Sequence, residues 1–232
     1  MIVTIHQPEH LPWSGFFHKM MCADLYVYLD HVQYRKNYFQ NRNKIVNSVG
    51  KEAWASIPLR SGKLNDAILD KEIVCGYSKK YIALIQSSYR KSKYFHKYYD
   101  KFHSIIINEH RNLVDLNLDI IDFFREVLNI NTPIVRSSEF NISSSKSEMC
   151  LDICLKTGAD KYISGPSGLD YLDIDTFLDR NIELLVHNYI SPVYKSNHFY
   201  PNLSTLDLLF NHGEDSRQII LDSGNILKIN NR

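Results

Sequence analysis

The sequence predicts an α/β protein with a mainly parallel, Rossmann-like sheet, a β-hairpin flap and a helical insertion. Three observations support this fold class. The chain opens with a strand, a helix and a second strand. A helical stretch then interrupts the pattern, and after residue 133 strands and helices alternate again. Alternation of this kind is typical of parallel sheets with helices on both faces.

The first 30 residues predict the start of the sheet. Residues 1–6 (MIVTIH) form a continuous apolar run rich in β-branched side chains, which is typical of a buried strand. Residues 15–23 are a helix candidate, and residues 25–30 (LYVYLD) form a second buried strand. This order predicts two parallel strands joined by a right-handed crossover.

The middle of the chain departs from the α/β pattern. Residues 41–59 predict two strands joined by a tight turn at NSVG, and we expect this hairpin to lie over the site as a flap. Residues 77–108 show helical spacing of apolar side chains and hold one or two helices. Residues 113–128 (LVDLNLDIIDFFREVL) form the clearest amphipathic helix. The helical insertion therefore spans about residues 77–128.

The last 100 residues return to alternation. The pattern predicts strands at 134–140, 161–165 and 182–189, and helices at 146–159, 173–181 and 204–213, with Gly158 as a helix end signal. We expect the polar residues at the end of the chain to be loosely held. The length suits a single domain over residues 1–232.

Composition excludes some classes of function. Lys and Arg number 27 against 26 Asp and Glu, so the formal net charge of +1 gives no support for a nucleic-acid partner. No stretch has the length and apolar character of a signal peptide or a membrane span. We therefore expect a cytoplasmic protein without a membrane span.

The four cysteines do not predict a disulfide framework. No C-x-x-C pair occurs, and Cys150 and Cys154 share one face of a predicted helix, where a disulfide is geometrically awkward. We interpret Cys154 as a packed thiol rather than a nucleophile, and we expect reduced thiols throughout.

Candidate catalytic residues come at the ends of predicted strands. His6, Asp30 and Ser164 each end a strand, and ligands of open parallel sheets bind beyond these carboxyl ends. His6 is a candidate general base, and Asp30 is a candidate to orient it or to hold a substrate amine. The alternatives are a hydrogen-bonded loop histidine and a turn-capping aspartate.

Further candidates follow the second and later strands. Gln33 is extended, and Asn41 and Arg42 open the hairpin, where Arg42 suits contact with a phosphate; a solvated strand-edge arginine is the alternative. The glycine-bearing loop in residues 158–168 (GADKYISGPSG) permits close approach of a phosphate or a sugar, but it matches no dinucleotide fingerprint or P-loop.

We expect no metal ligand among these residues. His6 and His10 have metal-ligand spacing only in a helix, and Pro8 and Pro12 disfavour a helix there. We interpret His10 as a loop residue whose replacement by Phe changes little.

Six stretches, taken together and in order, resemble the WbqC-like family. They are IHQPEHLPWSGFFHK, ADLYVYLDHVQYRKNYFQNRNKI, FHKYYD, ICLKTGADKYISGPSGLDYLD, SPVY and STLDLLFNHG. The positions that match its motifs are His6, Gln7, Pro8, Trp13, Asp30, Gln33, Asn41, Arg42, His96, Ser164, Gly165, Tyr171 and Asn211. The chain departs from the family at His10, where the resemblance implies an aromatic residue.

The resemblance implies a role in bacterial O-antigen or other surface-polysaccharide biosynthesis, beside enzymes that make nucleotide-linked deoxyamino sugars. The first hypothesis is an enzyme that transfers an acyl or aminoacyl group to the amine of such a nucleotide sugar. His6 and Asp30 are then catalytic, and Arg42 grips the diphosphate. The other substrate-binding residues are Gln7, Trp13, Gln33, Asn41, His96, Ser164, Gly165, Tyr171 and Asn211. The acyl donor, coenzyme A or a carrier protein, stays open.

Two alternatives belong to other classes. A nucleotidyltransferase or adenylate-forming enzyme is suggested by a histidine loop after the first strand, although HQPEH lacks the glycine of the H-x-G-H motif. A non-catalytic sugar-binding protein is consistent with the 15 tyrosines and with the lack of a complete catalytic motif. The oligomeric state stays open.

Overall fold

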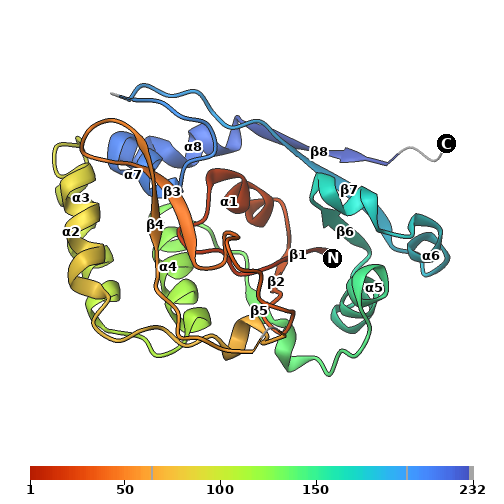
Figure 1. Ribbon diagram of the computed structural model, residues 1–232. Helices are drawn as coiled ribbons and strands as arrows, with labels where there is room; N and C mark the ends of the chain where they lie inside the picture. Colours follow the sequence, from red (N-terminus) through yellow and green to blue (C-terminus); the bar gives the residue numbers. More distant parts are fainter. Residues whose placement is uncertain (64, 197, 230–232) are drawn as a thin grey trace.

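The computed structural model describes residues 1–63, 65–196 and 198–229, and its centre is a six-stranded sheet (Figure 1). The strand order is β5-β2-β1-β6-β7-β8. The strands are β1 (Ile2–His6), β2 (Leu25–Tyr28), β5 (Ile134–Arg136), β6 (Lys161–Ser164), β7 (Glu183–Tyr189) and β8 (Gly224–Lys228). All neighbours pair in parallel except β7 and β8. The predicted α/β class with a mainly parallel sheet is confirmed.

The strand order reverses beside β1. The chain proceeds outward from β1 to β2 and β5, then returns to the other side of β1 and continues outward through β6 and β7. This is the order 3-2-1-4-5-6 of doubly wound sheets, in which ligands bind where the order reverses. The crevice between the carboxyl ends of β1 and β6 is therefore the expected ligand position.

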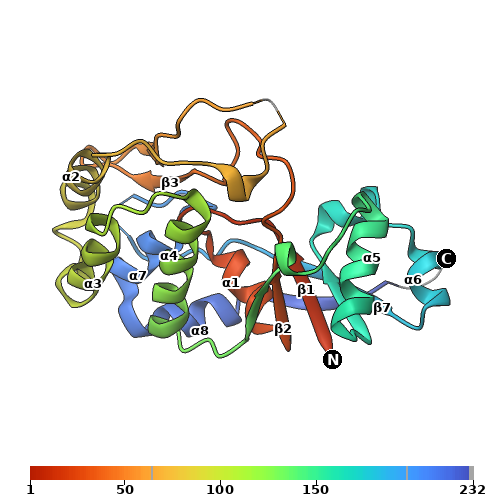
Figure 2. The same cartoon turned by 90° about the horizontal axis from the view of Figure 1, so that it is seen from below.

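Helices cover both faces of the sheet (Figure 2). One face carries α1 (Ser14–Met21), α4 (Leu113–Val127), α7 (Thr205–His212) and α8 (Ser216–Leu221); the other carries α5 (Lys146–Thr157) and α6 (Ile174–Asp179). Side chains alternate between the two cores along β2 and the residue after it: Tyr26 and Tyr28 belong to the first core, whereas Val27 and Leu29 belong to the second.

In the sequence, the predicted hairpin and helices come between β2 and β5, which are neighbours in the sheet. The hairpin strands β3 (Arg42–Val46) and β4 (Glu52–Ser56) pair antiparallel in a sheet of their own, and α2 (Ser78–Tyr89) and α3 (Phe95–Ile107) precede α4. Ile45 and Ala55 of the hairpin are buried in the same core as these helices. The hairpin strands therefore pack against helices: β4 against α2 of the insertion, and β3 against α7, which comes late in the chain. A single domain over residues 1–232 stays a prediction.

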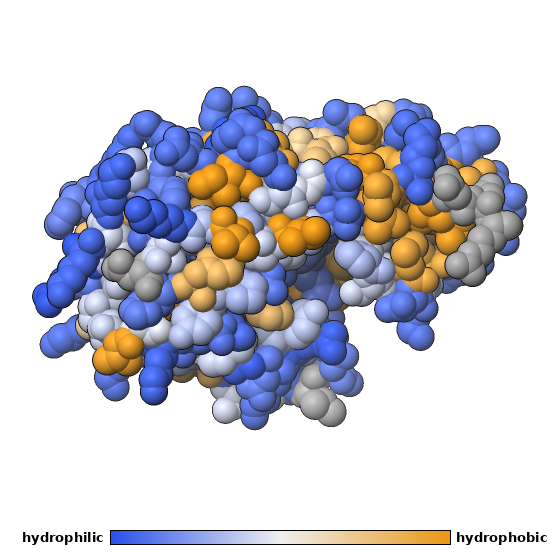
Figure 3. Space-filling model, turned by 90° about the horizontal axis from the view of Figure 1, so that it is seen from above, coloured by the Kyte–Doolittle hydropathy of each residue, from blue (hydrophilic) through white to orange (hydrophobic). Residues whose placement is uncertain are grey.

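Two local predictions are corrected. Residues 224–228, expected to be loosely held, form β8, because an edge strand can keep polar side chains in water while its backbone pairs with β7. Figure 3 shows apolar side chains at this end of the molecule, where Leu227 of β8 is 47% exposed. The strand predicted over 134–140 ends at Arg136, and Ser137–Glu139 form a short 3₁₀ turn. Further 3₁₀ turns are Ile68–Asp70, Pro166–Asp170 and Gly213–Asp215.

The end of α5 gives a test of local backbone strain. Gly158 ends the helix at φ 70° and ψ 39°, and an added Cβ would meet no atom within 4 Å. We expect Gly158→Ala to lower the free energy of unfolding by about 1 kcal/mol through the left-handed backbone alone. Gly165→Ala is the matched control, since Gly165 has φ −70° and equal space. Urea denaturation measures both, and equal stability of the two variants would contradict the assignment.

Candidate functional site

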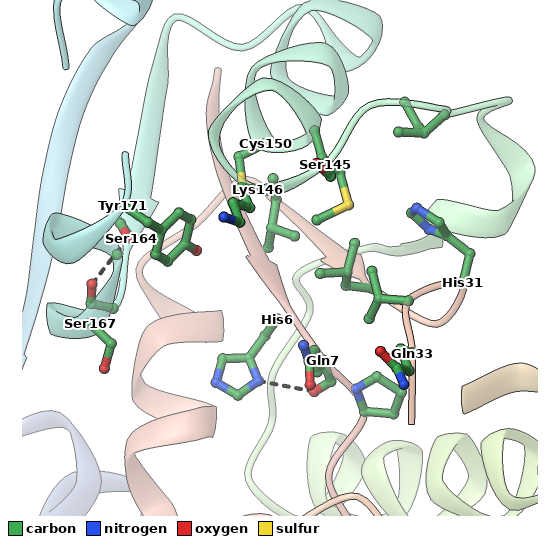
Figure 4. Close-up of a pocket in the computed structure, with 18 of the residues that line it drawn as sticks. His6, Gln7, His31, Gln33, Ser145, Lys146, Cys150, Ser164, Ser167 and Tyr171 are labelled. Carbon is green, nitrogen blue, oxygen red and sulfur yellow. Dashed lines mark hydrogen bonds between the residues drawn. The ribbon is translucent and has the colours of Figure 1, made fainter. Parts of the chain in front are cut away.

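A cleft of about 1000 Å³ opens at the carboxyl ends of β1, β2 and β6 (Figure 4). We call it the main cleft. His6 and Gln7 lie after β1, Ser164 ends β6, and the start of α5 forms the opposite wall. Its polar lining is His6, Gln7, Glu9, Lys19, His31, Gln33, Arg35, Tyr38, Gln40, Ser143, Ser144, Ser145, Lys146, Cys150, Tyr162, Ser164, Ser167 and Tyr171. The main cleft thus occupies the position at which the strand order reverses.

His6 is held as a neutral imidazole with one defined basic nitrogen. Its Nδ1 lies 3.0 Å from the carbonyl oxygen of Gln7, which can only accept, so Nδ1 carries the proton and Nε2 has the free electron pair. The ring packs edge-on against Phe16 at 5.0 Å. Burial, helped by the nearby Lys19 cation, lowers the pKa of His6 to about 3. The imidazole is therefore uncharged at neutral pH.

Glu9 and Lys19 complete a buried cluster with His6. Glu9 Oε1 lies 3.9 Å from His6 Nε2, and Lys19 Nζ donates to the carbonyl oxygen of Ile5 at 3.1 Å. Glu9 is only 8% exposed and Lys19 only 4%. Burial raises the pKa of Glu9 to about 8 against the opposing effect of Lys19, and burial lowers the pKa of Lys19 to about 8 against the opposing effect of Glu9.

One oxygen of Glu9 has no partner. Within the described part of the chain, Oε2 is buried and makes no hydrogen bond. A buried carboxyl oxygen without a partner is costly, and such groups concentrate where a ligand completes the site. The cluster of His6, Glu9 and Lys19 is therefore the strongest candidate for the reaction centre.

Comparison with protein families matches residues 7–219 to the WbqC-like protein family. The chain belongs to this family. The resemblance read from the six sequence stretches is thereby confirmed. A similar protein, described as uncharacterized, comes from Mycobacterium tuberculosis; it is 29% identical over 220 residues, which cover 92% of this chain and 95% of the relative. No solved structure matches the chain.

The sequence had suggested that Asp30 of this WbqC-like protein orients His6. Its carboxylate instead bonds to residues that end β5 and follow it. Its buried carboxylate accepts from Arg136 Nε at 2.6 Å, from the Ser137 and Ser138 hydroxyls at 3.1 and 2.9 Å, and from the Ser138 amide at 3.0 Å. These groups come from the end of β5, which pairs with β2. Asp30 therefore ties two strand ends together, and Glu9 is the carboxyl group beside His6.

The other predicted residues divide into two groups. Gln7, Gln33, Ser164, Gly165 and Tyr171 line the main cleft as expected, and Trp13 lines an adjoining pocket with His6 and Glu9. The remaining four lie elsewhere: Asn41, Arg42, His96 and Asn211.

Each of these four residues has a local partner. Arg42 donates to the Asn37 carbonyl oxygen at 2.5 Å and lies over the Trp54 ring at 4.2 Å. Asn41 bonds Tyr34 and Ile57. His96 contacts the Phe95 ring, and Asn211 donates to the Asp207 carbonyl oxygen. The segment before the hairpin, which includes Arg35, Tyr38 and Gln40, lines the main cleft in place of Arg42.

Several cleft residues were missed from the sequence. The serine cluster at 143–145 and Lys146 were not among the predicted site residues, yet they form one wall. Lys19 carried a signal, since it is a charged residue between the buried Phe17 and Met20 of α1. A charged side chain on an apolar helix face indicates a buried partner. The described residues bring no three potential metal ligands together, and no described helix is long and apolar enough to cross a membrane.

His10 lies in the loop between β1 and α1, as predicted, but its side chain belongs to the core. It is fully buried; its Nδ1 donates to Asn117 Oδ1 at 3.0 Å, and its Nε2 accepts from the Tyr81 hydroxyl at 2.6 Å. Asn117 in turn donates to the Gln40 carbonyl oxygen, and the Gln40 side chain donates to Gln7 Oε1. The helices of the insertion thus close over the loop and connect it to the main cleft.

The buried histidine gives a prediction on stability. His10→Phe leaves the Asn117 and Tyr81 groups without their partner, so we expect the free energy of unfolding to fall by about 1–3 kcal/mol. Urea denaturation measures the change, and the double variant with Tyr81→Phe should lose less than the sum of the two single changes. A change below about 0.5 kcal/mol, within the range of surface substitutions, would contradict this role.

The raised pKa of Glu9 gives a prediction on pH dependence. The folded-state pKa of Glu9, about 8, lies above the ordinary value of 4.5 for a glutamate, so folding favours the protonated acid. Its stabilising contribution is full below pH 4.5 and is lost as the pH rises through about 8. Glu9→Gln mimics the neutral acid and does not titrate. The free energy of unfolding of the variant, relative to that of the wild type, should therefore rise steadily from about pH 5 to about pH 8. Glu148→Gln, at an exposed position, is the control, and an unchanged difference for Glu9→Gln would contradict the shift.

Proposed function

We propose that this WbqC-like protein is an enzyme of bacterial surface-polysaccharide (O-antigen) biosynthesis. It transfers an acyl group from an activated donor to the amine of a nucleotide-linked deoxyamino sugar. The observation that carries the proposal is the buried His6–Glu9 pair, with an unpartnered carboxyl oxygen, at the point where the strand order reverses. Family membership supports the pathway, and the site supports the chemistry.

The main cleft suits a nucleotide sugar in size and polarity. Small-molecule sites of proteins occupy roughly 300–1000 Å³, and this cleft lies at the upper end of that range. Hydroxyl groups of Ser143, Ser145 and Ser167 and the cations of Arg35 and Lys146 line it. In the proposed complex these groups bind the diphosphate, a role that the sequence had suggested for Arg42.

The buried cluster suits an amine as the attacking group. The substrate ammonium donates to the unpartnered Glu9 Oε2 and to His6 Nε2, which accepts. The pKa of Glu9, about 8, lies much nearer to neutral pH than that of His6, about 3, so Glu9 is the stronger base of the two. Glu9 therefore takes the proton from the amine, and His6 orients the nitrogen toward the acyl carbon.

The transfer step balances with an acyl thioester or ester as the donor. The neutral amine nitrogen forms a bond to the acyl carbon, and the bond from that carbon to the sulfur or oxygen of the carrier breaks. The proton held by Glu9 passes to the departing carrier group. Glu9, ionised again, then takes the second proton, which the acylated nitrogen loses, and releases it to solvent. The products are an N-acylated nucleotide sugar and a free carrier, either coenzyme A or a carrier protein.

Screening and turnover test this function. Nucleotide sugars are screened by thermal shift, where a ligand at 100 times its Kd stabilises by about 2.7 kcal/mol. Binders are then incubated with acyl donors, and the amide product is measured by mass spectrometry. Binding without turnover for every donor would favour the sugar-binding alternative. Release of pyrophosphate from a nucleoside triphosphate would favour nucleotidyl transfer.

Two variants test the assigned roles. Glu9→Gln should reduce turnover by about 10²–10⁴-fold, the range for loss of a positioned proton-transfer group. His6→Ala should also reduce turnover, because the acceptor that orients the amine is lost, and both variants should keep the folded state. Both variants should retain nucleotide-sugar binding within a few-fold, since the diphosphate contacts lie elsewhere in the main cleft. Glu148→Gln is the control on the exposed surface of α5. Wild-type turnover in Glu9→Gln would move the proton transfer to another group.

A further inference from the structure

A smaller cavity adjoins the main cleft at the reaction centre. This side pocket has a volume of about 380 Å³, and it shares His6, Glu9, Lys19, Tyr38, Gly165 and Ser167 with the main cleft. The two cavities therefore meet at the His6–Glu9 pair. A molecule in the side pocket and a molecule in the main cleft would both reach His6 Nε2 and Glu9.

The part of the side pocket beyond this junction is mainly apolar. Trp13, Phe16, Phe39 and Pro166 line it. The Trp13 indole is firmly placed: it meets the Tyr189 ring edge-on at 5.3 Å and covers Gly15, where an added Cβ would lie 2.4 Å from the indole. Rigid aromatic walls of this kind favour apolar groups through burial of their surface.

Three polar residues of the side pocket, Asn43, His187 and Lys19, already have partners. Asn43 donates to the Leu11 carbonyl oxygen and accepts from the Lys44 amide. His187 Nε2 lies 2.9 Å from His18 Nδ1, and Lys19 donates to Ile5. Glu9 lines both cavities and would attract an ammonium group on a chain in the side pocket. The nearby Lys19 cation repels such a group and so opposes this attraction. The deeper part of the pocket therefore offers a chain apolar contact and few polar contacts.

We infer that the side pocket holds the chain of the transferred group, and that this chain is a short apolar acyl chain rather than an amine-bearing aminoacyl chain. The inference rests on the proposed acyl transfer and specifies its donor. The acyl carbon lies at the junction, the chain contacts Trp13 and Phe39, and the carrier extends outward. The attacking amine arrives from the main cleft.

The two tryptophans provide a direct test. Trp13 lines the side pocket, whereas Trp54 lies on the hairpin and is 40% exposed. Butyramide, a short acyl amide, is titrated into ¹⁵N-labelled wild-type protein while the two indole N–H resonances are followed. We expect butyramide to shift the Trp13 resonance and to leave that of Trp54 in place. Trp54→Phe assigns the two signals.

Glycinamide and a pocket variant complete the experiment. Glycinamide, which carries an ammonium group, should shift Trp13 much less than butyramide does. Phe39→Ala should weaken butyramide binding at least about fivefold through lost apolar contact, and Ile107→Ala, at an exposed position of α3, is the control. An unmoved Trp13 signal, or an equal or larger shift with glycinamide, would overturn the inference.

Failure of this inference is distinct from failure of the proposed function. If butyramide binds at Trp13 but no acyl donor gives a product, the side pocket stands and the transferase proposal fails. If the amide product forms while butyramide leaves Trp13 unmoved, transfer stands and the side pocket is not its acyl site.

Discussion

The parallel pairing of β1 with strands on both of its sides is the constraint on which the site depends. Strand β1 pairs with β2 on one side and β6 on the other, so its backbone is fixed and the following loop must leave at the carboxyl edge. That exit places His6, Gln7 and Glu9 between two crossovers that run in opposite directions. The cluster owes its position to sheet topology and its chemistry to the loop.

The loop that buries Glu9 after β1 is held in place by residues outside the sheet. Glu9, in the loop after β1, and Lys19, on α1, are both buried, and desolvation opposes the charged form of each. A chain of hydrogen bonds holds the loop in place; it runs from Gln7 through Gln40 and Asn117 to His10. The helical insertion thus supports the loop that carries the site. Among the described residues, none of its side chains lines the main cleft.

The sequence was sufficient for the sheet and for the end of its first strand. Apolar runs with β-branched residues identified β1, β2, β6 and β7, and strand-end logic placed His6 and Ser164 in the cleft. It was not sufficient for Asp30, because its partner Arg136 lies 106 residues further along the chain and only strand pairing brings them together. It was not sufficient for Glu9 and Lys19 either, since their interaction depends on burial by both faces of the fold. Strand β8 was not predicted, because an edge strand does not need an apolar sequence.

The buried contacts of His10 bear on how relatives of this protein can be recombined. His10 departs from the aromatic residue that the family resemblance implies, and it is bonded to Asn117 of α4 and Tyr81 of α2. These three side chains form one unit whose members lie in separate segments of the sequence. A chimera that exchanges the helical insertion between relatives would separate them and would leave polar atoms in a dry core. Exchange of the insertion should therefore succeed only when the residue at position 10 is exchanged with it.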